Sequence, residues 1–154
     1  MKINKIPYIS LVVMALGPYA LAAEQNYSSS DLEAERDRVV HQYILDLGQA
    51  DYQGISALFE EGGTVVSTSQ GNVNAKDFFY SFLPNVESAI TEFHQAFVNN
   101  VDNNRYAARF HFNFKLKDGE TGDGEYVDEF IFVNNSAKLA SVYMFENLKF
   151  NVTP

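Results

Sequence analysis

The chain has 154 residues, of which 46% are hydrophobic and 14% aromatic, with 13 Phe, 9 Tyr, no Trp and no Cys. This length allows one domain with a substantial core, and the composition excludes a disordered chain. The formal net charge of −9 argues against binding to nucleic acid or an anionic membrane, and no basic stripe offsets it. Without cysteine there is no disulfide, thiolate nucleophile, lipid-modified cysteine or cysteine-based metal site.

The first residues have the pattern of an export signal. A short cationic start precedes an apolar stretch that Gly17-Pro18 interrupts, and small residues follow. We predict a signal peptide over residues 1–23, with cleavage after Ala22 or Ala23. An uncleaved membrane anchor is the alternative, although the uninterrupted apolar run is short for a bilayer span. We therefore expect an exported protein of the bacterial periplasm, with no membrane association after cleavage.

The next segment is expected to lead into a helical region. Residues 24–30 have the composition of a disordered lead-in to a single domain over residues 31–150. Ser30 and Glu33 form a capping box, and apolar residues then recur at helical spacing over residues 31–49. The first predicted helix therefore covers residues 31–49.

Two shorter helices are predicted after it. Asp51 can cap a helix over residues 52–61, and Asn74 can cap another over residues 75–83, which Pro84 stops. A strand over residues 64–69 is expected between them. The remaining strands are predicted over residues 89–98, 105–117, 124–133 and 138–150. Helices followed by consecutive strands predict an α+β domain whose helices pack on one face of an antiparallel sheet.

An acidic residue interrupts an aromatic face of the predicted sheet. In the stretch EYVDEFIFV, strand alternation places Asp128 on the same face as Tyr126, Phe130 and Phe132. Burying a carboxylate among rings is costly unless it is paired or protonated. Asp128 is therefore either a buried acid tied to a backbone amide or a tyrosine, or a polar group that lines a pocket.

Two long stretches of this chain resemble proteins of the NTF2-like superfamily, in its SnoaL-like and ketosteroid-isomerase-like branch. The segment Val39–Val66 (VVHQYILDLGQADYQGISALFEEGGTVV) resembles their opening helices and first strand, and Gly124–Phe145 is similar to their last hairpin. With the helix at residues 78–83, the resemblance covers nearly all of residues 31–150. It implies a cone-shaped domain, with three N-terminal helices packed on a curved antiparallel sheet around an apolar pocket.

The resemblance also implies roles for individual residues. Tyr43 falls where ketosteroid isomerases have the tyrosine of the oxyanion hole, and Asp128 where they have a protonated aspartic acid. Ser67 falls where the family has its catalytic aspartate, and serine cannot by itself abstract a proton from carbon near neutral pH. On the residues alone, Tyr43 is equally compatible with a core position on the apolar stripe of the first helix.

A set of aromatic residues is expected to line the pocket. Its members are Phe59, Phe78, Phe82, Phe110, Phe112, Phe114, Tyr126, Phe130 and Phe132. His94 is a candidate replacement base because some relatives carry a pocket histidine on that strand. Alternation points it away from Phe93 and Phe97, however, unless a bulge re-aims it. The histidine spacing predicts no metal site, and no cofactor is expected.

Two hypotheses about function follow. The first is a protein with an aromatic pocket that binds a small hydrophobic molecule through Tyr43 and protonated Asp128, with isomerase, cyclase or dehydratase chemistry if a base is present. The second is a non-catalytic accessory or interaction domain, expected to form a homodimer, whose working surface is the open sheet face with Arg109, His111, Asn113 and Lys115.

Overall fold

The computed structural model describes residues 28–147, and the predicted signal peptide over residues 1–23 lies outside them. The helices are α1 (Ser29–Gln49), α2 (Tyr52–Ala57) and α3 (Ala75–Phe82), followed by the 3-10 turn η1 (Leu83–Asn85). The strands are β1 (Phe59–Ser67), β2 (Gly71–Asn74), β3 (Val86–Val98), β4 (Arg105–Leu116), β5 (Thr121–Phe132) and β6 (Leu139–Asn147).

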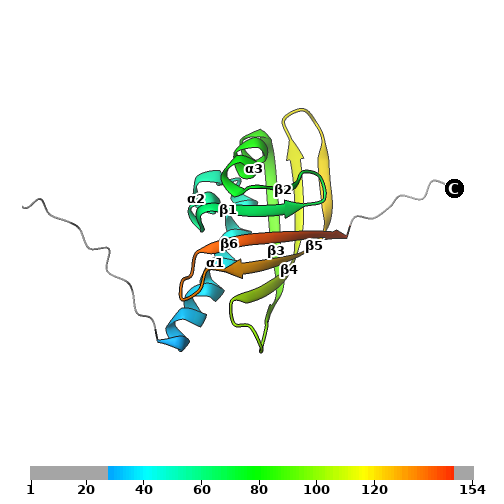
Figure 1. Cartoon of the computed structure of the whole chain (residues 1–154). Helices are drawn as coiled ribbons and strands as arrows, with labels where there is room; N and C mark the ends of the chain where they lie inside the picture. Colours follow the sequence, from blue (N-terminus) through cyan, green and yellow to red (C-terminus); the bar gives the residue numbers. More distant parts are fainter. Residues whose placement is uncertain (1–27, 148–154) are drawn as a thin grey trace, which may run out of the picture.

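The six strands form one curved sheet, in the order β2-β1-β6-β5-β4-β3, with the helices on its inner side (Figure 1). The predicted α+β architecture is confirmed. Two features differ from the prediction. The short strand β2 was not predicted, and β1 runs parallel to β6, so that the sheet is mixed. The two strands are neighbours in space but far apart in sequence, a relation that local patterns do not report. The inner face and the helices share one core that includes Val40, Ile55, Phe79 and Phe130.

Two predicted helix boundaries were wrong. The N-cap of α1 is Ser28, whose hydroxyl accepts from the amide of Asp31, so Ser29 and Ser30 belong to the helix and not to a lead-in. Helix α2 ends at Ala57. Phe59, predicted to be helical, begins β1 opposite Leu139 of β6 and is buried in the core. Tertiary pairing therefore overrides the helical spacing of this short segment.

A β-bulge in β3 changes which side chains face the helices. Phe93 pairs with the inward-facing Phe110, but the next paired residue is Gln95, opposite Arg109, so His94 is the extra residue. Phe97 consequently pairs with Ala107 on the outer face. The expectation that Phe93 and Phe97 share a face was wrong, because one inserted residue reverses the alternation beyond it.

Buried Arg36 ties α1 to two loops at one end of the sheet. Its guanidinium donates to the carbonyl oxygens of Asn103, Val133 and Ser136, at 2.7, 3.0 and 2.9 Å respectively. It also lies over the ring of Phe132, 5.1 Å from the centroid. These contacts satisfy a buried charge that has no carboxylate partner among the described residues.

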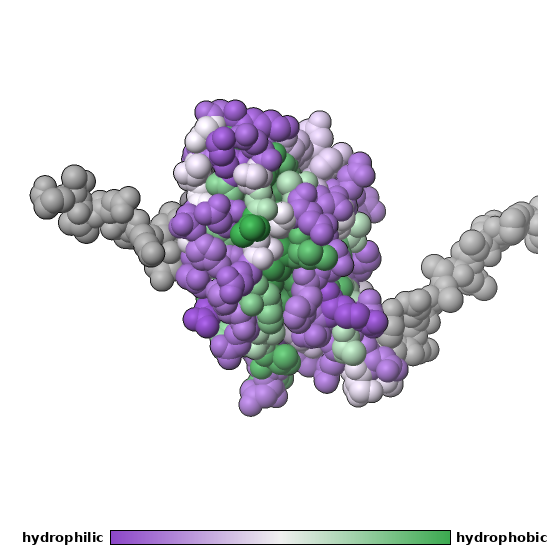
Figure 2. Space-filling view, turned by 180° about the vertical axis from the view of Figure 1, so that it is seen from behind, coloured by the Kyte–Doolittle hydropathy of each residue, from purple (hydrophilic) through white to green (hydrophobic). Residues whose placement is uncertain are grey.

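The surface carries apolar groups between polar ones. From behind, apolar surface forms a broken band along the middle of the molecule, with hydrophilic surface on both sides (Figure 2). The exposed large apolar side chains on the strands are Ile90, Phe93, Phe97, Val98, Val127, Tyr143 and Phe145. No helix within residues 28–147 is long and apolar enough to span a membrane.

Candidate functional site

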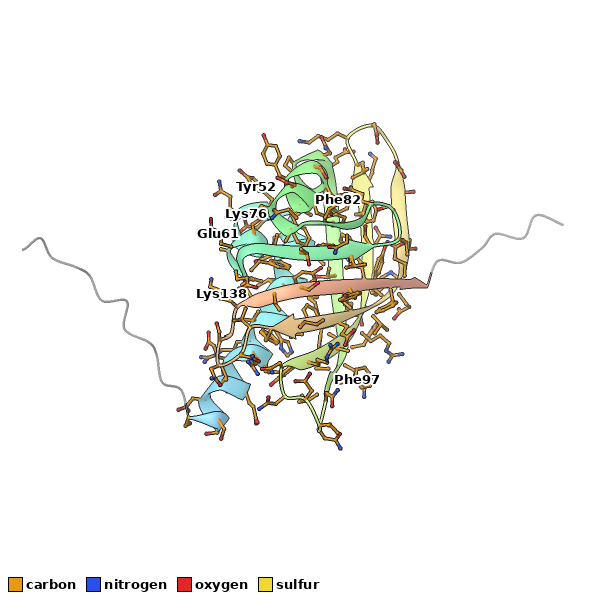
Figure 3. The ribbon with its side chains drawn as sticks, viewed as in Figure 1. Tyr52, Glu61, Lys76, Phe82, Phe97 and Lys138 are labelled. Atoms are coloured by element: carbon orange, nitrogen blue, oxygen red, sulfur yellow. The ribbon has the colours of Figure 1, made fainter. Side chains whose placement is uncertain are left out.

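A cavity of about 320 Å³ lies between α3 and the inner face of β4, β5 and β6. Phe82 points from α3 towards the long strands, as Figure 3 shows, and its ring contacts those of Phe112 and Phe114. The lining residues are Leu47, Ser69, Gln70, Phe78, Phe82, Phe110, Phe112, Phe114, Glu120, Thr121, Gly122, Tyr126, Asp128, Met144 and Glu146. This volume is at the small end of the range for ligand sites.

Six of the nine rings expected to line a pocket are at the wall of this cavity. They are Phe78, Phe82, Phe110, Phe112, Phe114 and Tyr126. The other three, Phe59, Phe130 and Phe132, are buried in the core instead, with exposed fractions of 5%, 0% and 3%. Alternation places a residue on the inner face, but only the positions of the helices decide whether core or cavity covers it.

A glycine makes room for one of these rings. Gly122 of β5 lies directly opposite Phe114 of β4 on the inner face. A Cβ atom at position 122 would lie only 2.3 Å from the Phe114 ring. The ring therefore covers the glycine and remains at the cavity wall, an arrangement that stabilises glycine within a strand.

Asp128 lies at the cavity wall and is 1% exposed. It pairs with Ala108 of β4 and Met144 of β6, neither of which offers a polar side chain. Its Oδ1 atom has no hydrogen-bond partner among the described residues. Burial raises the pKa of this carboxyl to about 8, the interaction with Tyr43 lowers it, and the charge of Glu146 raises it further. Asp128 is thus a neutral acid at pH 7, able to donate a hydrogen bond into the cavity.

Tyr43 is completely buried on α1 beside Asp128. Its ring makes edge contacts with Phe79 and Phe130, at centroid distances of 5.9 and 5.0 Å. Burial raises the pKa of the Tyr43 hydroxyl, and the charge of Asp128 raises it further. The two groups thus influence each other, yet the hydroxyl makes no hydrogen bond of ordinary length and angle. The structure brings the predicted pair together, with Asp128 at the cavity and Tyr43 behind it.

Ser67 has a structural contact of its own. It is buried at the end of β1, and its hydroxyl accepts from the amide of Gln70 at 3.1 Å. This contact stabilises the tight turn into β2. Ser67 does not line the cavity, whereas Ser69 and Gln70 of the same turn do.

His94 lies on the outer face of the sheet, away from the cavity. Its Nε2 atom is 3.4 Å from Oε1 of Glu125, and the same oxygen is 3.1 Å from Nδ1 of His111. The other ring nitrogen of His111 is 2.6 Å from Oδ1 of Asp123. The hydrogen bond to Glu125 raises the pKa of His111, although partial burial opposes it. The bulge therefore brings His94 to a histidine–carboxylate cluster instead of re-aiming it inwards.

This cluster is not arranged as a metal centre. Both ring nitrogens of His111 already face carboxylates. Within residues 28–147, no group of three or more His, Asp or Glu has an arrangement that would hold a metal ion. A shallow hollow of about 440 Å³ lies beside it, lined by His94, Arg109, Glu125, Val127, Phe145 and Glu146.

Sequence interpretation missed two charged residues at the cavity, Glu120 and Glu146. Glu146 of β6 lies opposite Tyr126 of β5 and lines the inner cavity, while it also borders the outer hollow near the end of the strand. A signal was present, because Val142, Met144 and Glu146 alternate along one strand face. The pattern could not show that this face meets a cavity.

Solved structures with the same architecture identify the fold. The pinacolase BvnE from Penicillium brevicompactum superposes with a TM-score of 0.64 and 11% identity, covering 75% of this chain and 88% of its own. The epoxide hydrolase/cyclase-like enzyme SalBIII gives 0.61 and 17%, covering 75% and 92%.

A hypothetical protein with a ketosteroid isomerase-like fold from Catenulispora acidiphila, in complex with trimethylamine, gives a TM-score of 0.58 and 10% identity, covering 70% of this chain and 83% of its own. The chain has the NTF2-like fold. At these identities the comparison establishes the architecture, and the predicted superfamily fold is confirmed. No protein-family model matches the sequence, and no curated protein matches it.

Proposed function

We propose that this NTF2-like domain binds a small, largely apolar molecule in the inner cavity. The proposal rests on the carboxyl group of Asp128. This group is buried, its pKa is raised to about 8, and its Oδ1 atom has no hydrogen-bond partner among the described residues. A buried polar atom without a partner costs free energy that a ligand can recover. The ligand would therefore offer a hydrogen-bond acceptor, such as a carbonyl or hydroxyl oxygen, to the protonated acid, with Tyr43 as its buried neighbour.

The architecture supports a small-molecule role. Solved neighbours of this fold include an enzyme described as epoxide hydrolase/cyclase-like and a pinacolase. A third neighbour, a hypothetical protein, was crystallised in complex with trimethylamine. The cavity here combines six aromatic rings with polar side chains that could orient a ligand, as ligand sites generally do. Isomerase, cyclase or dehydratase chemistry would also need a base, which neither Ser67 at its turn nor His94 on the outer face supplies. The proposal is therefore for binding.

Mass spectrometry tests the proposal directly. The purified full chain is expected to carry a small molecule, or to bind members of a fragment library, in native spectra and ligand-observed NMR. Asp128→Leu should abolish this binding because it removes the donor, whereas Asp128→Asn should retain part of it through its amide. Glu129→Gln, on the outer face of the same strand, is the matched control and should bind as the wild type does. Equal binding by Asp128→Leu and the wild type would contradict the proposal.

A second role is favoured by the outer sheet face. Phe97, Val127, Tyr143 and Phe145 are exposed there, and Arg109 lies among them without a carboxylate partner in residues 28–147. Exposed aromatic residues around an arginine are typical of protein–protein contacts. We propose that this face supports a homodimer. Sedimentation of the wild type and of Phe145→Glu tests it, since a monomeric wild type would exclude the role.

The site of action belongs to the same proposal. The export signal predicted over residues 1–23 would place the binding domain in the periplasm. Mass determination of the protein from a periplasmic extract should give a chain that begins after Ala22 or Ala23, and recovery of the full-length chain from the cytoplasm would contradict it.

A further inference from the structure

The charges at the cavity wall all have one sign. Three lining residues carry carboxyl groups, namely Glu120, Asp128 and Glu146, and none of the described lining residues is Lys, Arg or His. An anionic ligand would therefore meet no positively charged side chain among the described lining residues, and Glu120 and Glu146 would repel it. The wall is suited to neutral or cationic groups.

Glu146 is the group that could face a cationic ligand. It is partly buried and lies directly opposite Tyr126, at a register position where Cβ atoms are about 5 Å apart. Its carboxylate has no ion pair or hydrogen bond with another side chain in residues 28–147. Burial, and after it the charge of Glu146, raises the pKa of Tyr126 to about 12. The same charge also raises the pKa of Asp128. The carboxylate is therefore not neutralised by an ion pair, and its charge acts on two groups of the cavity wall.

The rings around Tyr126 favour a positive charge as well. Phe110 stacks with Tyr126 at a centroid distance of 5.7 Å, and Phe112 meets it edge-on at 5.8 Å. The faces of aromatic rings are negatively polarised and attract ammonium groups within about 6 Å. Tyr126 and Glu146, at paired positions of β5 and β6, place a ring and a carboxylate on the same part of the wall, a combination suited to alkylated ammonium groups.

An acidic wall alone would not identify a ligand site, but a second observation does. Asp128 is 1% exposed, lines the same cavity, and its Oδ1 atom has no partner among the described residues. A buried polar atom without a hydrogen bond of ordinary geometry costs free energy, which a ligand in the adjoining cavity can recover. Asp128 lies deeper than Glu146, so the two groups mark the inner and outer ends of one site.

We propose that the cavity selects ligands that carry a cationic nitrogen, held between the Tyr126 ring and the Glu146 carboxylate, with their neutral part among the phenylalanines. This inference rests on the proposed binding function and adds the chemical class of the ligand. A volume of about 320 Å³ corresponds to roughly ten water-sized volumes, so the ligand is a small amine or quaternary ammonium compound.

A pair of isosteric probes separates charge from shape. Phenyltrimethylammonium and tert-butylbenzene have the same shape and differ in the charge of one atom. Binding of each to the full chain is measured at pH 7 by ligand-observed NMR titration, with benzenesulfonate as an anionic probe. The cation should bind about tenfold more tightly than the neutral isostere, and benzenesulfonate should not bind.

Variants test whether Glu146 and Tyr126 cause the preference for the cationic probe. Glu146→Gln should remove most of the preference for the cation while leaving binding of tert-butylbenzene unchanged. Glu92→Gln, which makes the same charge change on the outer face of β3, is the matched control and should retain it. Tyr126→Leu keeps the site apolar without the ring and should also lose the preference, so the assignment does not depend on one variant.

The two proposals fail in different ways. Equal binding of the cation and its neutral isostere, or tighter binding of the isostere, would overturn the charge selectivity and leave the proposed binding function standing. The charge selectivity would also be overturned if neither probe bound while a library fragment bound to the wild type and not to Asp128→Leu. The proposed binding function would again stand. Absence of any Asp128-dependent ligand would overturn the binding function itself.

Discussion

Asp128 and Glu125 lie three residues apart on β5, and their side chains are on opposite faces of the sheet. On the inner face, burial raises the pKa of Asp128 to about 8. On the outer face, the hydrogen bond with His111 lowers the pKa of Glu125. The same functional group is therefore a neutral donor on one side and an ion on the other, which shows that burial, rather than residue type, determines what these acids can do.

The largest expected effect concerns Asp128 and pH. Because the pKa of about 8 in the folded protein exceeds the model value of 3.8, the folded state holds a proton that the unfolded state releases between these values. The free energy of unfolding should then fall as pH rises from about 4 to about 8, by about 5 kcal/mol. Asp128→Asn cannot lose a proton and should lack this slope.

Urea unfolding at pH 5, 7 and 9 measures this difference. Asp128→Asn should be more stable than the wild type at pH 9, and the two should be similar at pH 5. The outer-face control Glu125→Gln should retain the wild-type slope in the alkaline half of the range. A wild type whose stability is the same at pH 5 and pH 9 would show that Asp128 is solvated or ion-paired.

The aromatic residues give the next largest contrast. Phe110 on the inner face is fully buried, whereas Phe145 on the outer face is 55% exposed. Phe110→Ala should lower the free energy of unfolding by about 3–5 kcal/mol because it removes a fully buried ring and enlarges the adjoining cavity. Phe145→Ala should cost less than about 1 kcal/mol in a dilute, monomeric sample, because the ring is exposed within a single protomer. Equal costs in a more concentrated sample, measured by chemical denaturation, would mean that the outer face is covered by another subunit.

A smaller effect is expected at Ser67. Its hydroxyl accepts one backbone hydrogen bond from Gln70, so Ser67→Ala should lower the free energy of unfolding by about 1 kcal/mol. Ligand binding should not change, because Ser67 is outside the cavity wall. Loss of binding in this variant at unchanged stability would instead assign the serine a direct role in the site.

The smallest effect belongs to the outer-face cluster. His111 should titrate with a pKa above the ordinary histidine value because Glu125 and Asp123 bind its ring nitrogens. Its contribution to stability is then present below the unfolded histidine pKa and is lost as pH rises through the folded value. Glu125→Gln should lower the pKa in an NMR titration, while Asp128→Asn should leave it unchanged. A response to Asp128→Asn would mean that the two faces are electrically coupled.

Local patterns predicted the elements better than their ends. The caps at Asp51 and Asn74 hold α2 and α3, since each side chain accepts from two backbone amides. The same reasoning wrongly extended α2 over Phe59. A single apolar residue fits both the spacing of a helix and the start of a buried strand, so the local pattern cannot distinguish them. Pairing with Leu139, 80 positions later in the chain, decides between the two.

At the candidate site, too, some features were visible in the local sequence and others were not. The chemistry of Asp128 was visible because a charge among rings breaks an alternation over a few residues. The position of His94 depended on a one-residue bulge, and the importance of Glu146 depended on the cavity beneath its strand face. Neither feature has a local signature, because both arise where separate strands meet.

The sequence by itself determined the order of the helices and of every strand except β2, the aromatic inner face and the presence of an acid within it, since these follow from spacing along one segment. Only the tertiary structure decided which rings line a cavity, that His94 faces outwards, and that Glu146 lies opposite Tyr126. These depend on contacts between distant segments, and such contacts also remove water from Asp128 and so keep its proton in place.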